Sequence, residues 1–289
     1  MAFTTLDLLS SIERRSFIPT NQNTYSQAEL LAIADEITST DIVPAIMSCR
    51  EDYFVHTSTI PVVANQALYD LPARSVNASL REIKLTNSDR NKNLVRVEIE
   101  NLHSNVTGNP HGFYFKGSNL GLYPTPSSDT GSIQYDFYLG PGSLVLPSAS
   151  AIIASINTST NIVSFSSLPA TFTTGTVFDF VSAKGEQNYR EISQTSTLVS
   201  GTDVTFSALP TGLSVGDYVT LEGTSPLLQM PTIFRYVLAQ GVAAQILMST
   251  GQSGAGDAFQ LFQKLLTDAV ETISPRVHGQ ARDIIQRNW

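Results

Sequence analysis

Apolar residues recur at helical spacing within the first 53 residues of the chain. They stand at Leu6, Leu8, Leu9 and Ile12, and again at Leu30, Ile33, Ala34 and Ile37. Ser26 and Glu29 lie three residues apart just before the second run, which is the spacing of a capping box. Ser39, Thr40 and Asp41 are candidate caps for a further helical piece, with Pro44 in its first turn, that runs to about Tyr53. The pattern predicts helices throughout this segment.

The last part of the chain returns to helical spacing and predicts an αα-hairpin. Its first apolar face is Ile233, Val237, Ala244 and Met248, and its second is Phe259, Phe262, Leu266, Ala269, Val270 and Ile273. Asp257 with Gln260 is the expected cap of the second helix, after the glycine-rich loop 250–256. Neither chain end can bury its apolar faces alone, so we expect 1–53 and 226–289 to pack together as one helical bundle.

Between residues 54 and 142 the apolar pattern has a period of two, which indicates β-strands. The candidate strands are 55–63, 68–71, 80–86, 94–99, 113–115, 120–123 and 133–138. Short strands at this spacing, separated by glycine, proline and asparagine, predict an antiparallel sandwich or barrel.

Residues 143–225 contain an internal repeat with an offset of 41 residues. Val163 to Pro169 is echoed by Val204 to Pro210, and Gly175 to Phe180 is echoed by Gly216 to Leu221. Two copies are too few for a solenoid. We therefore expect one small all-β domain inserted into the parent domain, with Phe165 and Phe206 in equivalent places. The predicted fold class is α+β, divided as 1–53, 54–142, 143–225 and 226–289.

Composition and charge limit the kinds of function that the chain can have. Hydrophobic residues make up 42% of the chain and charged residues 15%, which is typical of a folded protein. The net charge is −8, and no basic stripe of the kind that binds phosphates is present. Cys49 is the single cysteine, which excludes a disulfide framework. No signal peptide or membrane span is expected.

Candidate catalytic groups are sparse. His56, His103, His111 and His278 do not show the spacing of a helical metal site. Glu98 and Glu100 share one face of a predicted strand, but two carboxylates from one strand rarely converge on a substrate. The aromatic residues Phe113, Phe115, Tyr123, Tyr135, Phe137 and Tyr138 are interpreted as part core and part interface. No metal, cofactor or enzymatic reaction is predicted.

Three segments in series resemble a known family. They are Ala67 to Arg74, Leu80 to Ile83, and the predicted hairpin Gly112 to Pro126, which turns at Gly117, Ser118 and Asn119. In this order, and framed by helices at both chain ends, they resemble the head-to-tail adaptor (connector) proteins of tailed bacteriophages.

The resemblance implies a structural virion protein in the neck between capsid and tail. The expected partners are the portal protein, a tail or collar protein, and further copies of the chain in a ring, a dodecamer. The terminal helices would then surround a channel through which DNA passes without sequence-specific binding. A phage baseplate or fibre-attachment subunit is an alternative. A carbohydrate-binding or polysaccharide-degrading tail protein is an alternative of another class.

The C-terminal segment is the candidate contact site. It combines apolar and basic side chains, with Arg276, Arg282, Ile284, Ile285, Arg287 and the single tryptophan, Trp289. Tryptophan and arginine commonly anchor interfaces. In the adaptor family the C-terminal end typically reaches the portal ring, so the resemblance assigns portal contact to these residues.

Overall fold

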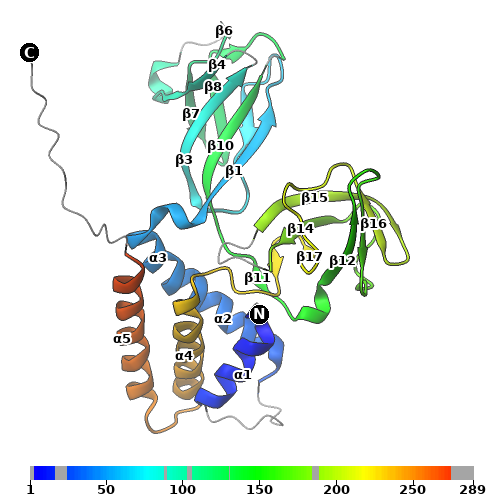
Figure 1. Ribbon diagram of the computed structural model, residues 1–289. Helices are drawn as coiled ribbons and strands as arrows, with labels where there is room; N and C mark the ends of the chain where they lie inside the picture. Colours follow the sequence, from blue (N-terminus) through cyan, green and yellow to red (C-terminus); the bar gives the residue numbers. More distant parts are fainter. Residues whose placement is uncertain are drawn as a thin grey trace, which may run out of the picture.

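The computed structural model describes residues 3–16, 25–87, 90–102, 106–129, 131–183 and 189–274. They form a mixed α+β structure with helices and several sheets, including a six-stranded barrel. The helices lie at one end of the molecule, a β-sandwich projects from them, and the barrel lies to one side (Figure 1). The predicted α+β class is confirmed.

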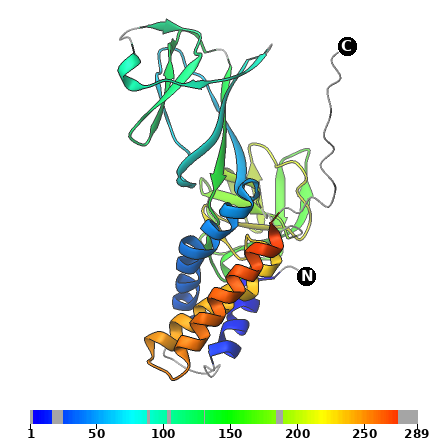
Figure 2. The ribbon, with the colours of Figure 1, turned by 90° about the vertical axis from the view of Figure 1, so that its left-hand side faces the viewer.

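The helices come from both ends of the chain and share one hydrophobic core. Buried members of this core include Leu8, Leu30, Ile46, Phe234 and Phe262. The central helix, α4, contacts α1, α2 and α5, while α3 contacts α5 (Figure 2). The helical elements are α1 (Thr5–Ser16), α2 (Gln27–Ile37), the π-helix η1 (Thr38–Ile42), α3 (Val43–Cys49), the 3-10 helix η2 (Glu51–Phe54), α4 (Thr232–Ser249) and α5 (Ala255–Ile273).

The capping box at the start of α2 is confirmed, because Ser26 and Glu29 each bond to the other's backbone amide. The other two helix starts differ from the prediction. Ser39 and Thr40 do not cap a new helix, because their hydroxyls donate to carbonyls of the preceding turn, and α2 continues through η1 into α3. Gly254, with φ of 93°, is the N-cap of α5 and has no side-chain cap bond. Asp257 lies inside its first turn.

The β-sandwich consists of two four-stranded sheets, in the orders β1-β10-β3-β4 and β2-β8-β7-β5. Leu120, Ile133, Tyr135 and Phe137 are among the residues buried between them. The strands are β1 (Val55–Pro61), β2 (Leu68–Asp70), β3 (Ser75–Asn87), β4 (Arg90–Asn93), β5 (Val95–Arg96), β6 (Thr107–Gly108), β7 (Gly112–Lys116), β8 (Asn119–Tyr123), β9 (Thr125–Pro126) and β10 (Ser132–Leu139).

Two pairings in this unit depart from the antiparallel prediction. β5 runs parallel to β7, and β6 runs parallel to β9. The predicted strand 94–99 is shortened to β5, because the chain turns through a 3-10 helix, η3 (Ile99–Asn101). β5 and β7 are therefore not joined by the tight hairpin that antiparallel neighbours use.

The barrel closes in the order β12-β13-β16-β15-β14-β17. Phe178, Phe180, Phe165 and Phe206 are buried in its core. Its strands are β12 (Ala151–Asn157), β13 (Ile162–Phe165), β14 (Val177–Val181), β15 (Tyr189–Ser200), β16 (Asp203–Phe206) and β17 (Tyr218–Leu221).

The two sequence repeats are related in the barrel by an approximate two-fold axis. Val163 pairs directly with its repeat equivalent Val204, and Asp179 pairs with its equivalent Thr220. Phe165 N donates to Thr202 O at 2.9 Å, and the equivalent Phe206 N donates to Asn161 O at 3.0 Å. The first repeat supplies β12, β13 and β14, and the second supplies β15, β16 and β17. Replacing each strand by its repeat equivalent reproduces the same order of strands around the barrel. Each repeat therefore contributes half of one closed barrel.

The first strands of the two repeats, β12 and β15, are not related by the offset of 41 residues. Ile153 pairs with Phe165, whereas Ser196 pairs with Phe206, so β12 and β15 are related by 43 positions. The turn between β15 and β16 is two residues shorter than the turn between β12 and β13, which accounts for the difference.

A short parallel strand pair joins the barrel to the rest of the molecule. β11 (Ser143–Leu144) leads towards the barrel and β18 (Thr224–Ser225) leads away from it, with Ser143 opposite Thr224. The two connections of the barrel therefore lie side by side. We refer to β11 and β18 together as the stalk.

Candidate functional site: the junction of helices, sandwich and barrel

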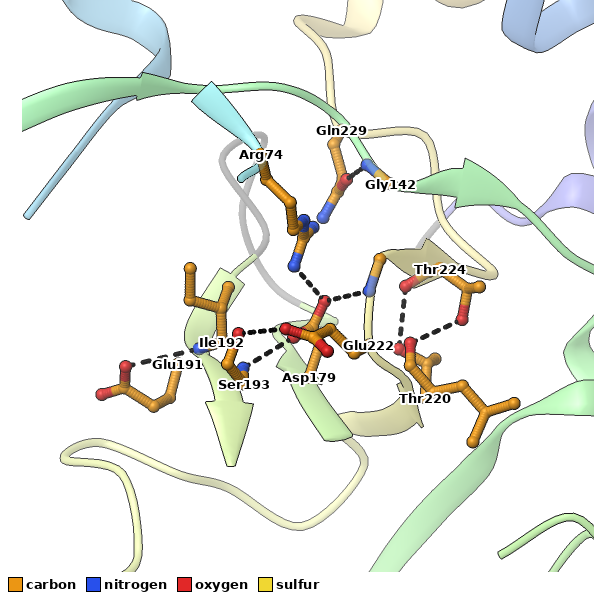
Figure 3. A network of polar contacts seen from close by, with 12 residues as sticks. Arg74, Gly142, Asp179, Glu191, Ile192, Ser193, Thr220, Glu222, Thr224 and Gln229 are labelled. Carbon is orange, nitrogen blue, oxygen red and sulfur yellow. Dashed lines mark hydrogen bonds and ion pairs between the residues drawn. The ribbon is translucent and has the colours of Figure 1, made fainter. Parts of the chain in front are cut away.

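A buried ion pair joins the sandwich to the barrel. Arg74, in the loop between β2 and β3, places Nη1 2.5 Å from Oδ2 of Asp179 in β14. The Asp179 side chain is fully buried, and it also accepts hydrogen bonds from the amides of Ser193 at 2.9 Å and Gly223 at 3.0 Å (Figure 3). The buried carboxylate thus has one cationic partner and two amide donors, which offset its loss of hydration.

The repeat symmetry shows that this contact is specific to one half of the barrel. The position equivalent to Asp179 is Thr220, whose hydroxyl donates to the carbonyl of Thr224 at 2.8 Å (Figure 3). That hydrogen bond stays within the barrel and its stalk. One copy of the repeat therefore carries the acid that binds the sandwich, while the other copy carries a neutral side chain.

His56, in β1, lies beside this ion pair. Burial, followed by the positive charge of Arg74, lowers the pKa of its imidazole, although Asp179 partly opposes the shift. The ring also packs edge-on against Phe137, with centroids 5.6 Å apart. His56 is therefore a neutral packing group at neutral pH.

Polar contacts attach the stalk and the residues that flank it to the helical unit. The Asp35 carboxylate of α2 accepts from Leu144 N at 2.9 and 3.1 Å, and Thr5 Oγ1 donates to Val145 O at 2.8 Å. Gln229 Oε1 accepts from Gly142 N at 2.7 Å (Figure 3). Together with the Arg74–Asp179 pair, these contacts fix the barrel relative to both other units.

Asp35 also borders a cavity between the helices and the β-units. Burial raises the pKa of its carboxyl to about 6, although the hydrogen bond from Leu144 N opposes that shift. Beside it lies a cavity of about 650 Å³ between α2, η1 and α3 on one side and the residues around Val76 and Gly140 on the other. We call it the junction cavity.

The predicted portal-contact residues Arg276, Arg282, Ile284, Ile285, Arg287 and Trp289 lie outside the described residues. His103 and His278 also lie outside them. His111 packs edge-on against Tyr123, with centroids 5.9 Å apart. In the described ranges, no cluster of histidine, cysteine and carboxylate residues has the arrangement of a metal site.

The other candidate groups occupy structural positions. Glu98 is exposed and lies 3.9 Å from Arg96, as expected of a solvated face. Of the six aromatic residues, Tyr135, Phe137 and Tyr138 are buried in the core and the other three are half-buried. They do not form an exposed stacking platform for sugars.

Exposed apolar side chains occur on the helical unit, the sandwich and the barrel, and two groups of them are considered as candidates for contact with other chains. Val95 and Ile99 lie on the sandwich, and Phe259 and Leu261 lie on α5. None of the helices in the described ranges is long and apolar enough to cross a membrane.

Arg74, Asp179 and Asp35 were not predicted from the sequence as site residues. Asp179 had a detectable signal, because it is a lone acid within the apolar strand Val177–Val181. Asp35 had no such sequence signal, because an acidic residue at a polar position of an amphipathic helix such as α2 is common.

The family model described as SU10 adaptor protein matches residues 27–177, which is more than half of the chain. The match includes α2, α3, the whole sandwich and the first strands of the barrel. No curated protein matches the chain.

Proposed function

We propose that this chain, which belongs to the SU10 adaptor protein family, is a structural adaptor that joins the portal to the tail of a phage virion. Family membership makes it a phage adaptor and a virion component at a coarse level. The finer proposal is a ring of identical chains, a dodecamer, at the neck, with DNA leaving the capsid through its centre. No reaction or cofactor forms part of this role.

The family match is the observation that carries the proposal, and the architecture supports it. The helical unit and the far end of the sandwich lie at opposite ends of the molecule (Figure 1). Exposed apolar residues occur both on α5 and on the sandwich. An adaptor needs two separated contact regions, one for each neighbour, and this arrangement provides them.

The negative charge of the chain is consistent with a passage for DNA. A net charge of −8 repels phosphates, so DNA would slide through a ring of such chains without being held. The oligomeric state can be measured by native mass spectrometry of the purified chain, alone and with portal. A twelve-copy species supports the proposal, and a monomer in both samples contradicts the ring.

The segment after Pro275 is the proposed portal contact. Ordering it on a partner costs backbone entropy. Burial of the large apolar side chains Ile284, Ile285 and Trp289 offsets part of that cost. Arg276, Arg282 and Arg287 add charge-assisted hydrogen bonds to carboxylates on the portal.

Truncation after Pro275 tests this contact. The shortened chain should retain its circular dichroism spectrum but lose binding to portal in a pull-down, and phage assembled with it should package DNA and then leak it. A matched control replaces Arg276, Arg282 and Arg287 by lysine, which keeps the charge but removes bidentate pairing, and should weaken binding less. Unchanged portal affinity after truncation would show that the helical unit is the anchor instead.

A further inference from the structure

The junction cavity has the chemistry of a binding site for a basic and apolar peptide. Val43, Pro44 and Met47 contribute an apolar wall from α3, and Val76 and Pro141 face the cavity from the β side. Asp35 and Glu36 contribute two carboxylates from α2. No lysine or arginine is among the described residues that line it.

Thr38 has a buried hydroxyl close to the cavity. It lines the cavity and is only 6% exposed, yet its hydroxyl has no hydrogen-bond partner among the described residues. A buried hydroxyl without a partner costs free energy, so such groups are usually paired with protein, water or a ligand.

Asp35 has no cationic partner among the described residues. Its carboxylate accepts only the Leu144 amide among the described contacts, and burial keeps its pKa at about 6. It is therefore largely charged at neutral pH. An arginine beside Asp35 and Glu36 would offset the cost of burying that charge.

We propose that the junction cavity binds the segment 276–289 of the same chain when the adaptor is not bound to portal. This segment supplies what the cavity lacks, because Arg282 and Arg287 carry guanidinium groups and Ile284, Ile285 and Trp289 carry large apolar side chains. Three arginines and one aspartate give the segment a net charge of +2 against an acidic cavity. The inference goes beyond portal contact, since it concerns the free protein.

The position of α5 makes this docking possible within one chain. α5 ends at Ile273, which packs against the helical core, and α5 contacts α3, the helix that forms the apolar wall of the cavity. The 15 residues from Pro275 to Trp289 span up to roughly 50 Å when extended, at about 3.3 Å per residue. That length is sufficient to pass around α3, whose 7 residues measure only about 10 Å.

Trp289 is the only tryptophan of the chain, so its fluorescence reports on this segment in the full-length protein. The experiment measures the emission maximum and acrylamide quenching of the free protein without portal. Docking predicts blue-shifted emission and quenching several-fold slower than in a peptide of residues 275–289. The double variant Asp35→Asn, Glu36→Gln should give the emission and quenching of the peptide. The amide introduced by Asp35→Asn retains an oxygen that accepts from Leu144 N, and circular dichroism verifies the fold.

A matched control changes the same number of charges away from the cavity. Asp257→Asn with Asp268→Asn, both exposed on α5, should leave the fluorescence as in the wild type. Lowering the pH below about 6 should also release Trp289, because a docked guanidinium favours the charged carboxylate and protonation of Asp35 removes that preference. Glu36 is the only other titratable side chain among the described residues that line the cavity.

Three outcomes would overturn the proposal. The first is a wild-type Trp289 that is quenched as fast as the peptide. The second is protection that the Asp35 and Glu36 variant does not reduce. The third is protection that disappears on dilution, which would mean that the segment docks on another copy. Because portal is absent, none of these results depends on whether the segment later binds portal.

Discussion

At the scale of single residues, the Arg74–Asp179 pair is the contact with the largest expected energetic effect. Asp179 is fully buried and Arg74 is 18% exposed, and they lie 105 positions apart in the chain. Exposed ion pairs such as Arg96–Glu98 contribute little, because water and salt screen them. Removing one partner of a buried pair leaves an unpaired charge in a poorly hydrated place.

We expect Arg74→Met to lower the free energy of unfolding by about 3 kcal/mol, the lower end of the range for buried pairs, since two amide donors remain on Asp179. Urea denaturation followed by circular dichroism measures this. Glu98→Gln, which disrupts an exposed pair, should cost less than about 1 kcal/mol. In the double variant Arg74→Met, Asp179→Asn, the loss should be smaller than the sum of the single losses. If the loss in the double variant equals the sum of the two single losses, the side chains of Arg74 and Asp179 do not interact directly.

Gly241 controls how closely α4 approaches its neighbours. A Cβ atom at this position would lie 2.8 Å from Cε2 of Phe262 and 3.3 Å from Cγ2 of Ile37. Residues from α5 and α2 therefore meet over one glycine of α4.

Gly241→Ala should therefore destabilise the protein by about 1–3 kcal/mol, because overpacking exceeds the gain of about 1 kcal/mol in helix propensity. Thermal unfolding measures the change. Gly256→Ala on α5 is the matched control: a Cβ there meets no atom within 4 Å, so no loss of stability is expected. Equal effects at both positions would refute the packing argument.

At the scale of elements, the barrel shows how a repeated sequence forms one closed sheet. β13 pairs with β16 and β14 pairs with β17, so each repeat pairs with the other rather than closing on itself. Neither half could bury its phenylalanines alone. The two halves differ where the barrel contacts the sandwich, at Asp179 and Thr220.

Val163→Ala and Val204→Ala should have nearly equal effects, because the two residues are paired across the axis and are 0% and 1% exposed. Each change should cost about 2 kcal/mol, from two carbon atoms at roughly 0.8 kcal/mol each plus a cavity term. Chemical denaturation measures both. Leu198→Ala, at a 54% exposed position of the same barrel, should stay within about 0.5 kcal/mol. If the losses for Val163→Ala and Val204→Ala differ by more than about 1 kcal/mol, the two positions are not equivalent in the barrel.

At the scale of the whole molecule, the stalk and contacts with the sandwich attach the barrel to the rest of the described chain. Outside the stalk, the Arg74–Asp179 pair and the packing of Ile192 against the sandwich core connect it to the sandwich. The stalk strands lie next to each other, and the helical unit holds them through Asp35 and Thr5.

Replacing residues 146–222 by a short Gly-Ser linker, which keeps both stalk strands, should therefore leave a soluble protein with native helical circular dichroism. The excised residues 146–222, expressed separately, should give a β-type spectrum, because they contain all six barrel strands and their core. An insoluble remainder, alongside a normally soluble full-length chain, would show that the barrel is part of the parent core and not an insertion.

Features that depend on residues close together in the chain were predictable from the sequence. The capping box of Ser26 and Glu29, the alternation of the sandwich strands and the repeat with Val163 and Val204 all arise from contacts or patterns within a few residues. The three segments that resemble adaptor proteins are of the same local kind. Such features were predictable because backbone propensity and side-chain periodicity decide them before the chain is folded.

Contacts between segments that are distant in the chain became visible only in the folded protein. The Arg74–Asp179 pair, the parallel pairing of β5 with β7 and the cavity between α2, α3 and Gly140 each join parts of the chain with no common local pattern. The start of α5 was mispredicted for a related reason, since the left-handed conformation of Gly254 and not the Asp257 side chain begins the helix. Packing selects such arrangements after loops have closed, and spacing along the sequence does not encode them.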